Sequence, residues 1–525
     1  MTLTSRNERA RKACLRMMAL ACAAGSALLL APGAARAEAA SEAAASAMLE
    51  EVSDNAARLR MFLQAMPKGG DLHNHLGGSV YAEDFLEVAA QKGMCADVAI
   101  TRIVAGPCGD DLKIARMATE RPFVFARLVD ALSTRGYQRG VGADEVSGHT
   151  QFFRSFDRFG AASAGENGRW LALARQSAER NGVSYLELML DPPGLIDFVR
   201  GAGTAPLDEA GIAALYSADS AELAPLLDGY VGEVDRIEAE ASARLSCEGK
   251  QADPACGVAV HYLTYALRGF SPRMVFRTLL GSFALAHRDP RFVGVNIVMP
   301  EDDPVALRDY GLHMAMFRFL EAKYPDVNVT MHAGELALGL VPPQDLADHI
   351  ARAVASGARR IGHGTDIAYE DDAPETLARM ARERIAVEVN LTSNAVILGV
   401  KGGEHPIALY RSMGVPVALS TDDEGVLRSD MTNEYRRAVT EQGLGYADLK
   451  ELARASLEYS FVPGASLWRE GRLGEAVSAC SASRTAGRCK PFLASSEKAR
   501  LQADLEDRFE RFEHGLDRFN HPQGS

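Results

Sequence analysis

Residues 70–75, Gly-Asp-Leu-His-Asn-His, begin the pattern that decides the fold of this 525-residue chain. The run is short, and its two histidines alternate with other residues, so that in a strand both rings point to one side. Gly77 and Gly78 follow it as a turn signal. Seven further β-prone runs of similar length occur along the chain. We expect the eight strands at residues 70–75, 184–190, 258–265, 292–299, 328–332, 360–363, 386–391 and 416–421.

Longer stretches with helical periodicity, such as residues 306–323 and 343–356, separate several of these runs. Alternating strands and helices indicate βα units and a parallel sheet. Eight such units predict an α/β fold, the (β/α)8 TIM barrel. The long segments outside this scheme are expected to be helical insertions. The predicted boundaries are a signal peptide at 1–37, an N-terminal helical segment at 38–65, the barrel with its insertions at 66–465 and a C-terminal helical extension at 466–525.

The N-terminus has the parts of a secretory signal peptide. Basic residues between Arg6 and Arg16 precede an apolar run at 17–30, and small residues at 35–37 offer a cleavage site after Ala37. The apolar run is too short for a membrane span. The absence of adjacent arginines favours the general secretory route. We therefore expect a periplasmic or secreted protein without a membrane anchor after signal removal.

The chain is acidic, with a formal net charge of −13 at pH 7. The predicted signal peptide is basic, so its removal leaves an even more acidic chain. A surface of this sign repels nucleic acid and favours solubility. The expected partner is therefore a small molecule, and the oligomeric state is left open.

Six cysteines follow the predicted signal peptide, and six cysteines allow 15 pairings. Their spacing favours three local disulfides, 95–108, 247–256 and 480–489, each closing a polar segment. An exported chain also favours disulfides over free thiols or a metal cluster. Scattered, unpaired cysteines are the alternative.

Nitrogen and oxygen donors gather at the ends of four predicted strands. His73 and His75 end the first, His332 the fifth and His363 the sixth, and Asp422 follows the eighth. In a barrel of this kind the strand ends collect at one face, where the active site lies. Imidazole and carboxylate ligands suit Zn²⁺ and can leave a coordination position for water. The pattern predicts a metal-dependent hydrolase.

Four motifs, in this order, resemble the adenosine deaminase family of metal-dependent barrel hydrolases. They are Asp71-Leu-His-Asn-His75, His332-Ala-Gly-Glu335, Ile361-Gly-His-Gly364 and Ser420-Thr-Asp-Asp423. The similarity covers about residues 66–465. The signal peptide, cysteines and insertions resemble the secreted, growth-factor-related branch of that family in a bacterial setting.

The resemblance implies hydrolytic deamination of adenosine or 2′-deoxyadenosine to inosine or 2′-deoxyinosine, with one Zn²⁺ per chain. His73, His75, His332 and Asp422 would bind the metal. Glu335 would protonate purine N1, His363 would orient the attacking water, and Asp422 could receive its proton. His75, Asp423, Gly77 and Met299 would face the substrate, with Asp423 at purine N7.

Two of these positions depart from the family's usual residues. Gly77 stands where an acidic residue often contacts the ribose 5′-hydroxyl, and Met299 where glycine often contacts purine N3. Gly77 leaves room for a 5′ substituent, so a deaminase of 5′-modified adenosine, or of another aminated ring, is an alternative.

Other classes fit less well. The predicted strand at 292–299 has no lysine to form the bridging carbamate of a two-metal hydrolase. The Pro-Cys-x-x-Cys motif of cytidine-type deaminases is also missing from the sequence. A secreted binding protein with a residual site would be expected to have a broken ligand set, whereas every matched position is intact.

Overall fold

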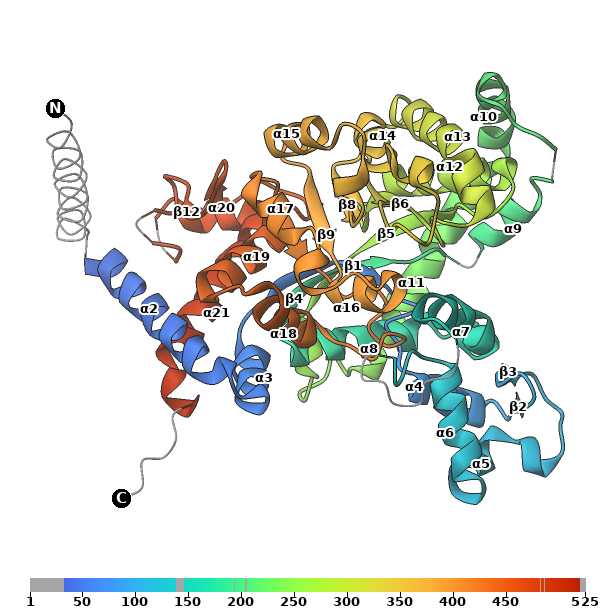
Figure 1. The fold of residues 1–525 in the computed structure, drawn as a ribbon, viewed down its shortest axis with the longest axis horizontal. Coiled ribbons are helices and arrows are strands. Elements are labelled where there is room, and N and C mark those ends of the chain that lie inside the picture. Colours follow the sequence, from blue (N-terminus) through green and yellow to red (C-terminus); the bar gives the residue numbers. More distant parts are fainter. Residues whose placement is uncertain are drawn as a thin grey trace, which may run out of the picture.

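The computed structural model describes residues 33–137, 146–192, 194–203, 205–481, 483–485 and 487–519. Its centre is a parallel eight-stranded sheet in the order β1-β4-β5-β6-β7-β8-β9-β10 (Figure 1). The predicted strands are all present, with ends shifted by a few residues. They are β1 Gly69–His75, β4 Val183–Met189, β5 Ala259–Leu267, β6 Phe292–Val298, β7 Asn328–Ala333, β8 Arg360–His363, β9 Ala386–Val389 and β10 Val417–Leu419.

The sheet closes through the residues that follow its last strand. Asn74 and Asp422 form an isolated parallel bridge. His75 N–H donates to Asp422 O at 3.0 Å, and Asp422 N–H donates to His73 O at 2.8 Å. The seam between the first and last strands therefore consists of the segments that carry three of the predicted metal ligands. The predicted (β/α)8 TIM barrel is confirmed.

Helices surround the barrel as the alternating pattern predicts. Those that follow barrel strands closely in the chain are α12 Pro272–Arg288, α13 Pro304–Glu321, α14 His349–Ala355, α15 Ala373–Glu383, α17 Ile407–Ser412, α18 Met431–Gln442 and α19 Tyr446–Glu458. After β9 the chain turns at once into a short helix, α16 Leu391–Ser393, and a π-helical turn at Asn394–Leu398. This turn ends β9 two residues before the predicted end of the strand.

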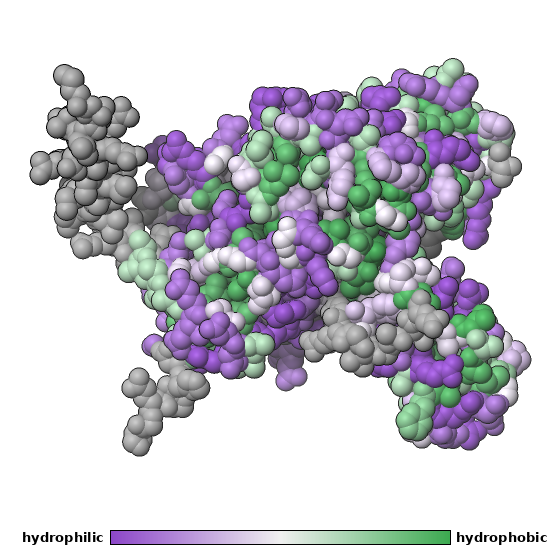
Figure 2. Space-filling model, in the orientation of Figure 1, coloured by the Kyte–Doolittle hydropathy of each residue, from purple (hydrophilic) through white to green (hydrophobic). Residues whose placement is uncertain are grey.

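The long insertions are mainly helical. Between β1 and β4 lie α4 Ala82–Gln91, α5 Ile114–Glu120, α6 Pro122–Ala131, α7 Gly148–Ser163 and α8 Asn167–Arg180, and between β4 and β5 lie α9 Leu195–Arg200, α10 Ile212–Leu223 and α11 Leu227–Arg244. The segment with α5 and α6 projects from the main body (Figures 1 and 2), and hydrophobic and hydrophilic residues are interspersed on the face shown.

Two hairpins correct the expectation of wholly helical insertions and of a wholly helical C-terminal extension. β2 Cys95–Asp97 pairs with β3 Arg102–Val104, and β11 Trp468–Arg469 pairs with β12 Arg472–Ala476, both antiparallel. The first hairpin is tied by the Cys95–Cys108 disulfide, and Gly471 turns the second with φ +70°. Strands of two to five residues are too short to show a period-two pattern.

All three predicted disulfides are present, so none of the six cysteines among the described residues is a free thiol. Cys95–Cys108, Cys247–Cys256 and Cys480–Cys489 have Cα–Cα distances of 6.2, 5.6 and 4.6 Å. Such bonds persist in oxidising compartments, which makes them compatible with a location outside the cytoplasm.

The terminal helices pack together beside the barrel (Figure 1). α2 Gly33–Ser53 and α3 Ala56–Ala65 begin the described chain, and α20 Cys489–Ser495 and α21 Glu497–His514 end it. Lys450 Nζ on α19 donates to Glu42 on α2 at 3.0 Å and to Glu513 on α21 at 2.7 Å. The first 32 residues of the predicted signal peptide lie outside the described residues. Among the residues described, no helix combines the length and the apolar character needed to cross a bilayer.

Candidate active site

The strand ends bring four predicted metal ligands together at the barrel seam. His75 Nε2 lies 3.2 Å from His332 Nε2 and 3.3 Å from Asp422 Oδ1. His73 Nε2 lies 3.4 Å from the same Asp422 oxygen. The four side chains converge from β1, β7 and the turn after β10.

These spacings fit a bound metal ion. A tetrahedral ion with bonds of about 2.0–2.1 Å separates its ligand atoms by about 3.3–3.4 Å. His73 Nε2 is buried without a hydrogen-bond partner, which is costly unless a ligand satisfies it. Three imidazoles and a carboxylate are donors that Zn²⁺ accepts. The four residues therefore fit a zinc site.

Buried acceptors orient two of the histidines. His73 Nδ1 lies 2.6 Å from Glu388 Oε2, and His332 Nδ1 lies 3.1 Å from Asn296 Oδ1. An acceptor at Nδ1 holds the ring proton there and leaves the Nε2 lone pair free for a metal. Glu388 and Asn296 are supporting residues that the sequence reasoning missed.

Glu388 is also part of a buried ionic network inside the barrel. Arg360 Nε donates to Glu388 Oε1 at 2.5 Å, and Arg360 Nη2 donates to Glu187 Oε2 at 2.6 Å. All three side chains are at most 1% exposed. Through Glu388, the His73 ring is therefore connected to the buried guanidinium of Arg360 in the barrel interior.

Glu335 is a buried acid beside this cluster. Burial, with the carboxylates of Asp422 and Glu301, raises the pKa of Glu335 well above its usual range. Its backbone N–H donates to Glu301 Oε2 at 2.7 Å, and its Oε1 lies 3.7 Å from His363 Nε2. A carboxylic acid held in this way keeps a proton that it can donate.

Three residues of this site have left-handed backbone conformations. Met299, His363 and Asp422 have φ values of +84°, +66° and +61°. Non-glycine residues rarely adopt these values, and such strain clusters at functional sites. Met299 thus takes a conformation that suits glycine, the residue that the family resemblance leads one to expect there.

Asp423 lies next to the cluster against the backbone of Gly78. Burial, with Asp422 and Glu335 nearby, raises the pKa of Asp423 well above its usual range. Its Oδ1 is buried without a hydrogen-bond partner, so the protonated carboxyl could donate a hydrogen bond to an acceptor on a ligand.

Replacing Gly78 by alanine is expected to destabilise the protein by about 1–3 kcal/mol, because the new methyl group would overpack this contact. A Cβ at Gly78 would lie 1.5 Å from Asp423 Oδ1, whereas a Cβ at Gly77 would have nothing within 4 Å. Urea denaturation of Gly78→Ala and of the control Gly77→Ala tests this. Equal midpoints for the two variants would contradict the close packing of Asp423 on Gly78.

A cavity of about 500 Å³ opens beside these residues. One wall comes from the α7 insertion and contains three phenylalanines, and the other comes from the loops after β5 and β6. No lysine or arginine is among the described residues that line it. The lining residues are His75, Phe152, Phe153, Phe156, Asp157, Tyr265, Leu267, Phe270, Val298, Met299, Pro300, His332, Glu335, Asp422 and Asp423.

The cavity brings together most of the predicted substrate contacts. His75, Met299 and Asp423 line it, whereas Gly77 is exposed and does not. The α7 phenylalanines were missed by the sequence reasoning. The available signal was their spacing in the helical segment 151–157. Phe156 is four residues after Phe152 and three after Phe153, and both spacings bring side chains together on a helix.

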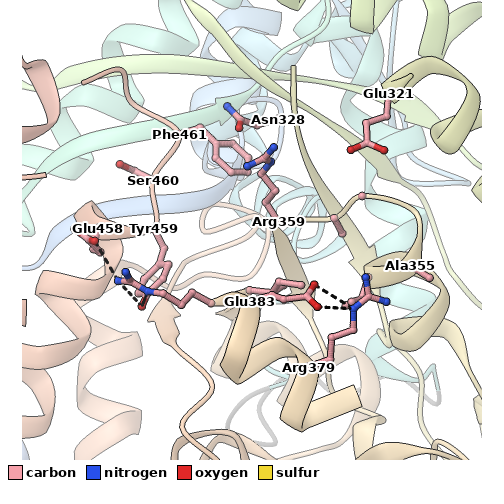
Figure 3. Close-up of a pocket in the computed structure, with 15 residues that line it drawn as sticks. Glu321, Asn328, Ala355, Arg359, Arg379, Glu383, Glu458, Tyr459, Ser460 and Phe461 are labelled. Atoms are coloured by element: carbon pink, nitrogen blue, oxygen red, sulfur yellow. Dashed lines mark hydrogen bonds and ion pairs between the residues drawn. The ribbon is translucent and has the colours of Figure 1, made fainter. Parts of the chain in front are cut away.

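A second crevice lies at the opposite end of the barrel (Figure 3). Its residues include Asn328 at the start of β7 and Arg359 just before β8. Charged side chains there already pair, as Arg379 does with Glu383 at 3.1 Å. In parallel barrels chemistry collects at the other end, and this crevice carries none of the predicted site residues.

Comparison with known proteins supports the sequence resemblance. Residues 237–468 match the family model for adenosine deaminase. An adenosine deaminase from Shewanella loihica is 32% identical over 158 residues, which are 29% of this chain and 44% of that protein. An aminodeoxyfutalosine deaminase from Streptomyces coelicolor is 41% identical over 106 residues, 20% of this chain and 27% of that protein. The matches thus span less than half of the length of these two relatives.

The fold is also shared with a solved structure. An amidohydrolase from Burkholderia ambifaria with bound Zn has a TM-score of 0.50 and 17% identity, covering 85% of this chain and 94% of that one. At this identity the likeness concerns the fold alone.

Proposed function

We propose that the protein, whose residues 237–468 match the family model for adenosine deaminase, is a zinc-dependent hydrolase. It would convert adenosine and 2′-deoxyadenosine to inosine and 2′-deoxyinosine, with release of ammonia. One observation carries the proposal. Three contacts among His73, His75, His332 and Asp422 bring their ligand atoms to 3.2–3.4 Å from one another, and three of these residues line the same cavity as Glu335, an acid that burial keeps protonated.

His73, His75, His332 and Asp422 would hold the zinc ion. A bound zinc ion would supply a nucleophile at neutral pH by lowering the pKa of its water to about 7. The side chains of the cavity would bind the purine, hold its C6 close to the four proposed metal ligands and supply a proton.

Glu335 would donate its proton to purine N1, which removes the negative charge that would otherwise build up on the ring. Addition of water at C6 and cleavage of the C6–N bond then release ammonia and leave a carbonyl. Asp423, protonated because of its raised pKa, would donate a hydrogen bond to N7. His363 would direct its Nε2 toward the reacting face from beside Glu335.

The cavity favours a nucleoside over a nucleotide. A phosphate carries a charge of about −1.5 to −2 at pH 7 and is usually held by arginine, lysine or a helix N-terminus. The described residues that line this cavity include Asp157 on α7 but no cationic side chain except histidine.

A 5′-modified adenosine is the second candidate substrate. Gly77 has open space where its Cβ would be, and the α7 wall presents Phe152, Phe153 and Phe156 to the cavity. An apolar 5′ substituent would therefore find the apolar surface of the three phenylalanines.

We also infer that the protein works in the periplasm or outside the cell. The predicted signal peptide at residues 1–37 and the three disulfides both support export.

Removing the metal is expected to abolish deamination, to below about 1% of the untreated rate, because the nucleophile depends on it. The protein is treated with a chelator, and absorbance is followed with adenosine, 2′-deoxyadenosine, 5′-methylthioadenosine and AMP. One equivalent of Zn²⁺ should restore the rate, and AMP should be the poorest substrate.

The control for this experiment is His287→Ala, since His287 is exposed and lies on α12, away from the cluster. It should bind one zinc ion and react as the wild type does. Full turnover by metal-free protein, or none with any of the four substrates after zinc is restored, would refute the proposed activity.

A further inference from the structure

The cluster contains one more possible ligand than a tetrahedral metal site needs. Ligand atoms of His73, His332, His363 and Asp422 all lie within 4.8 Å of one another. His363 is fully buried, and its Nε2 has no hydrogen-bond partner. Position alone therefore does not decide whether this ring binds the metal or donates a hydrogen bond.

The answer depends on which ring nitrogen carries the proton. A neutral imidazole has one donor and one acceptor nitrogen, and only the acceptor can bind a metal. Two side-chain amides face Nδ1 of His363: Asn394 Nδ2 lies 3.0 Å from it and Asn390 Nδ2 lies 3.5 Å from it. A residue that fixes the proton of His363 also fixes its role.

A series of hydrogen bonds that starts at a backbone N–H determines which ring nitrogen of His363 carries the proton. Ile407 N–H lies 3.2 Å from His405 Nδ1, and a backbone N–H can only donate. His405 Nδ1 is therefore the acceptor, and its Nε2–H donates to Asn394 Oδ1 at 3.0 Å. Asn394 then presents its amide nitrogen, and Nδ2–H donates to His363 Nδ1 at 3.0 Å. This leaves the proton of His363 on Nε2.

The same logic gives the opposite result for two of the proposed metal ligands, His73 and His332. Nδ1 of His73 faces a carboxylate oxygen of Glu388. Nδ1 of His332 faces Asn296 Oδ1, which also accepts from the backbone N–H of Ile297 at 2.7 Å. Acceptors at Nδ1 leave a lone pair on Nε2, whereas the donor at His363 leaves a proton there.

The residues of this hydrogen-bond series are buried, and Asn394, His405 and Ile407 are close in sequence. Asn394 is 0% and His405 3% exposed. Burial lowers the pKa of His405 to about 4, so this ring is neutral and has one donor and one acceptor. Asn394 opens the π-helical turn Asn394–Leu398, a geometry often found at functional sites.

We propose that Asn394, held by His405, is a positioning residue that keeps His363 out of the metal coordination and points its Nε2–H into the cavity. A bound metal would then have four protein ligands rather than five, and the reacting molecule could join it as the fifth ligand. The consequence for turnover rests on the proposed deaminase function, but the position of the proton does not.

The test replaces Asn394 by aspartate, which has nearly the same shape but no donor. His363 should then carry its proton on Nδ1, facing the new carboxylate, with a free lone pair on Nε2. In ¹⁵N-histidine-labelled, metal-free protein, the Nε2 resonance should move from the protonated to the unprotonated range. In Co²⁺-loaded protein the visible absorption should weaken, as it does when a fifth ligand joins a tetrahedral site, and kcat should fall by about 10- to 100-fold.

A second pair of variants guards against misfolding of the aspartate variant. His405→Gln keeps a donor for Asn394 Oδ1 and should retain the wild-type resonance and spectrum. His405→Phe removes that donor. Its Nε2 resonance and its Co²⁺ absorption spectrum should therefore shift toward those of the Asn394→Asp variant. An unchanged Nε2–H in Asn394→Asp, or identical behaviour of the two His405 variants, would overturn the proposal. Wild-type protein with the expected resonances but without turnover would refute the deaminase function and leave the proton assignment standing.

Discussion

The Glu335→Gln variant is expected to lose about 10²- to 10⁴-fold in kcat while it keeps its full metal content. Glutamine has the shape of the protonated acid and can still donate a hydrogen bond, but it has no acidic proton to transfer. Glu335 is not one of the four residues proposed to bind zinc, so the metal content should not change. Metal analysis and single-turnover absorbance on the same samples measure both quantities.

The pH profile gives this experiment a second readout. Burial raises the pKa of Glu335, so the protonated acid persists above the usual range and is lost as pH rises through that raised value. The wild-type rate should therefore fall on the alkaline side, and the residual rate of Glu335→Gln should lack that fall. Glu321→Gln is the control, because Glu321 lines the crevice at the opposite end of the barrel. A Glu335→Gln variant as active as the wild type would rule out Glu335 as the proton donor.

The Arg360→Met variant is expected to lose about 3–5 kcal/mol of stability, since it leaves the carboxylates of Glu187 and Glu388 buried without their cation. Arg360 is 1% exposed, it also donates to Tyr459 O at 3.0 Å, and its guanidinium lies 3.7 Å from the Phe461 ring centroid. Methionine fills much of the volume but replaces none of these contacts.

The adjacent residue provides a matched control. Arg359 is exposed and lines the crevice in Figure 3, so Arg359→Met should change stability by less than about 0.5 kcal/mol. Urea denaturation of both variants measures the difference. Similar midpoints would show that the buried network contributes little.

The same network predicts a pH effect with a definite sign. Although burial opposes it, Arg360 and His73 lower the pKa of Glu388 to about 2. A lowered pKa adds stability above the unfolded-state value of about 4.3, and this stability is lost as pH falls from there toward 2. The free energy of unfolding of Arg360→Met should therefore decrease less than that of the wild type as the pH falls.

The sequence predicts the barrel and the reacting residues because both depend on local patterns. Each strand is a short β-prone run, and His73, His332 and Asp422 lie at strand ends, where a barrel must bring them together. The disulfides could also be predicted, because each closes a short segment.

The supporting residues could not be predicted in the same way. Glu187 and Glu388 are single charges within apolar strands, and their partner Arg360 is far away in sequence. Only the folded barrel shows that the side chains of Glu187 on β4, Arg360 on β8 and Glu388 on β9 contact one another. The role of Asn394 likewise depends on hydrogen-bond directions that a residue pattern does not contain.

The barrel seam also sets the order in which the site can form. Asp71 and Thr421 touch across it, yet they lie 350 positions apart in the chain. At a synthesis rate of about 5–20 residues per second, the second half of the metal site is made roughly 20 to 70 s after the first. Until then His73 and His75 lack the carboxylate of Asp422 and the neighbouring edge of the barrel. If the proposed zinc site is correct, metal binding would be one of the last events in the maturation of this chain, and a chain exported before it folds would take its zinc from outside the cytoplasm.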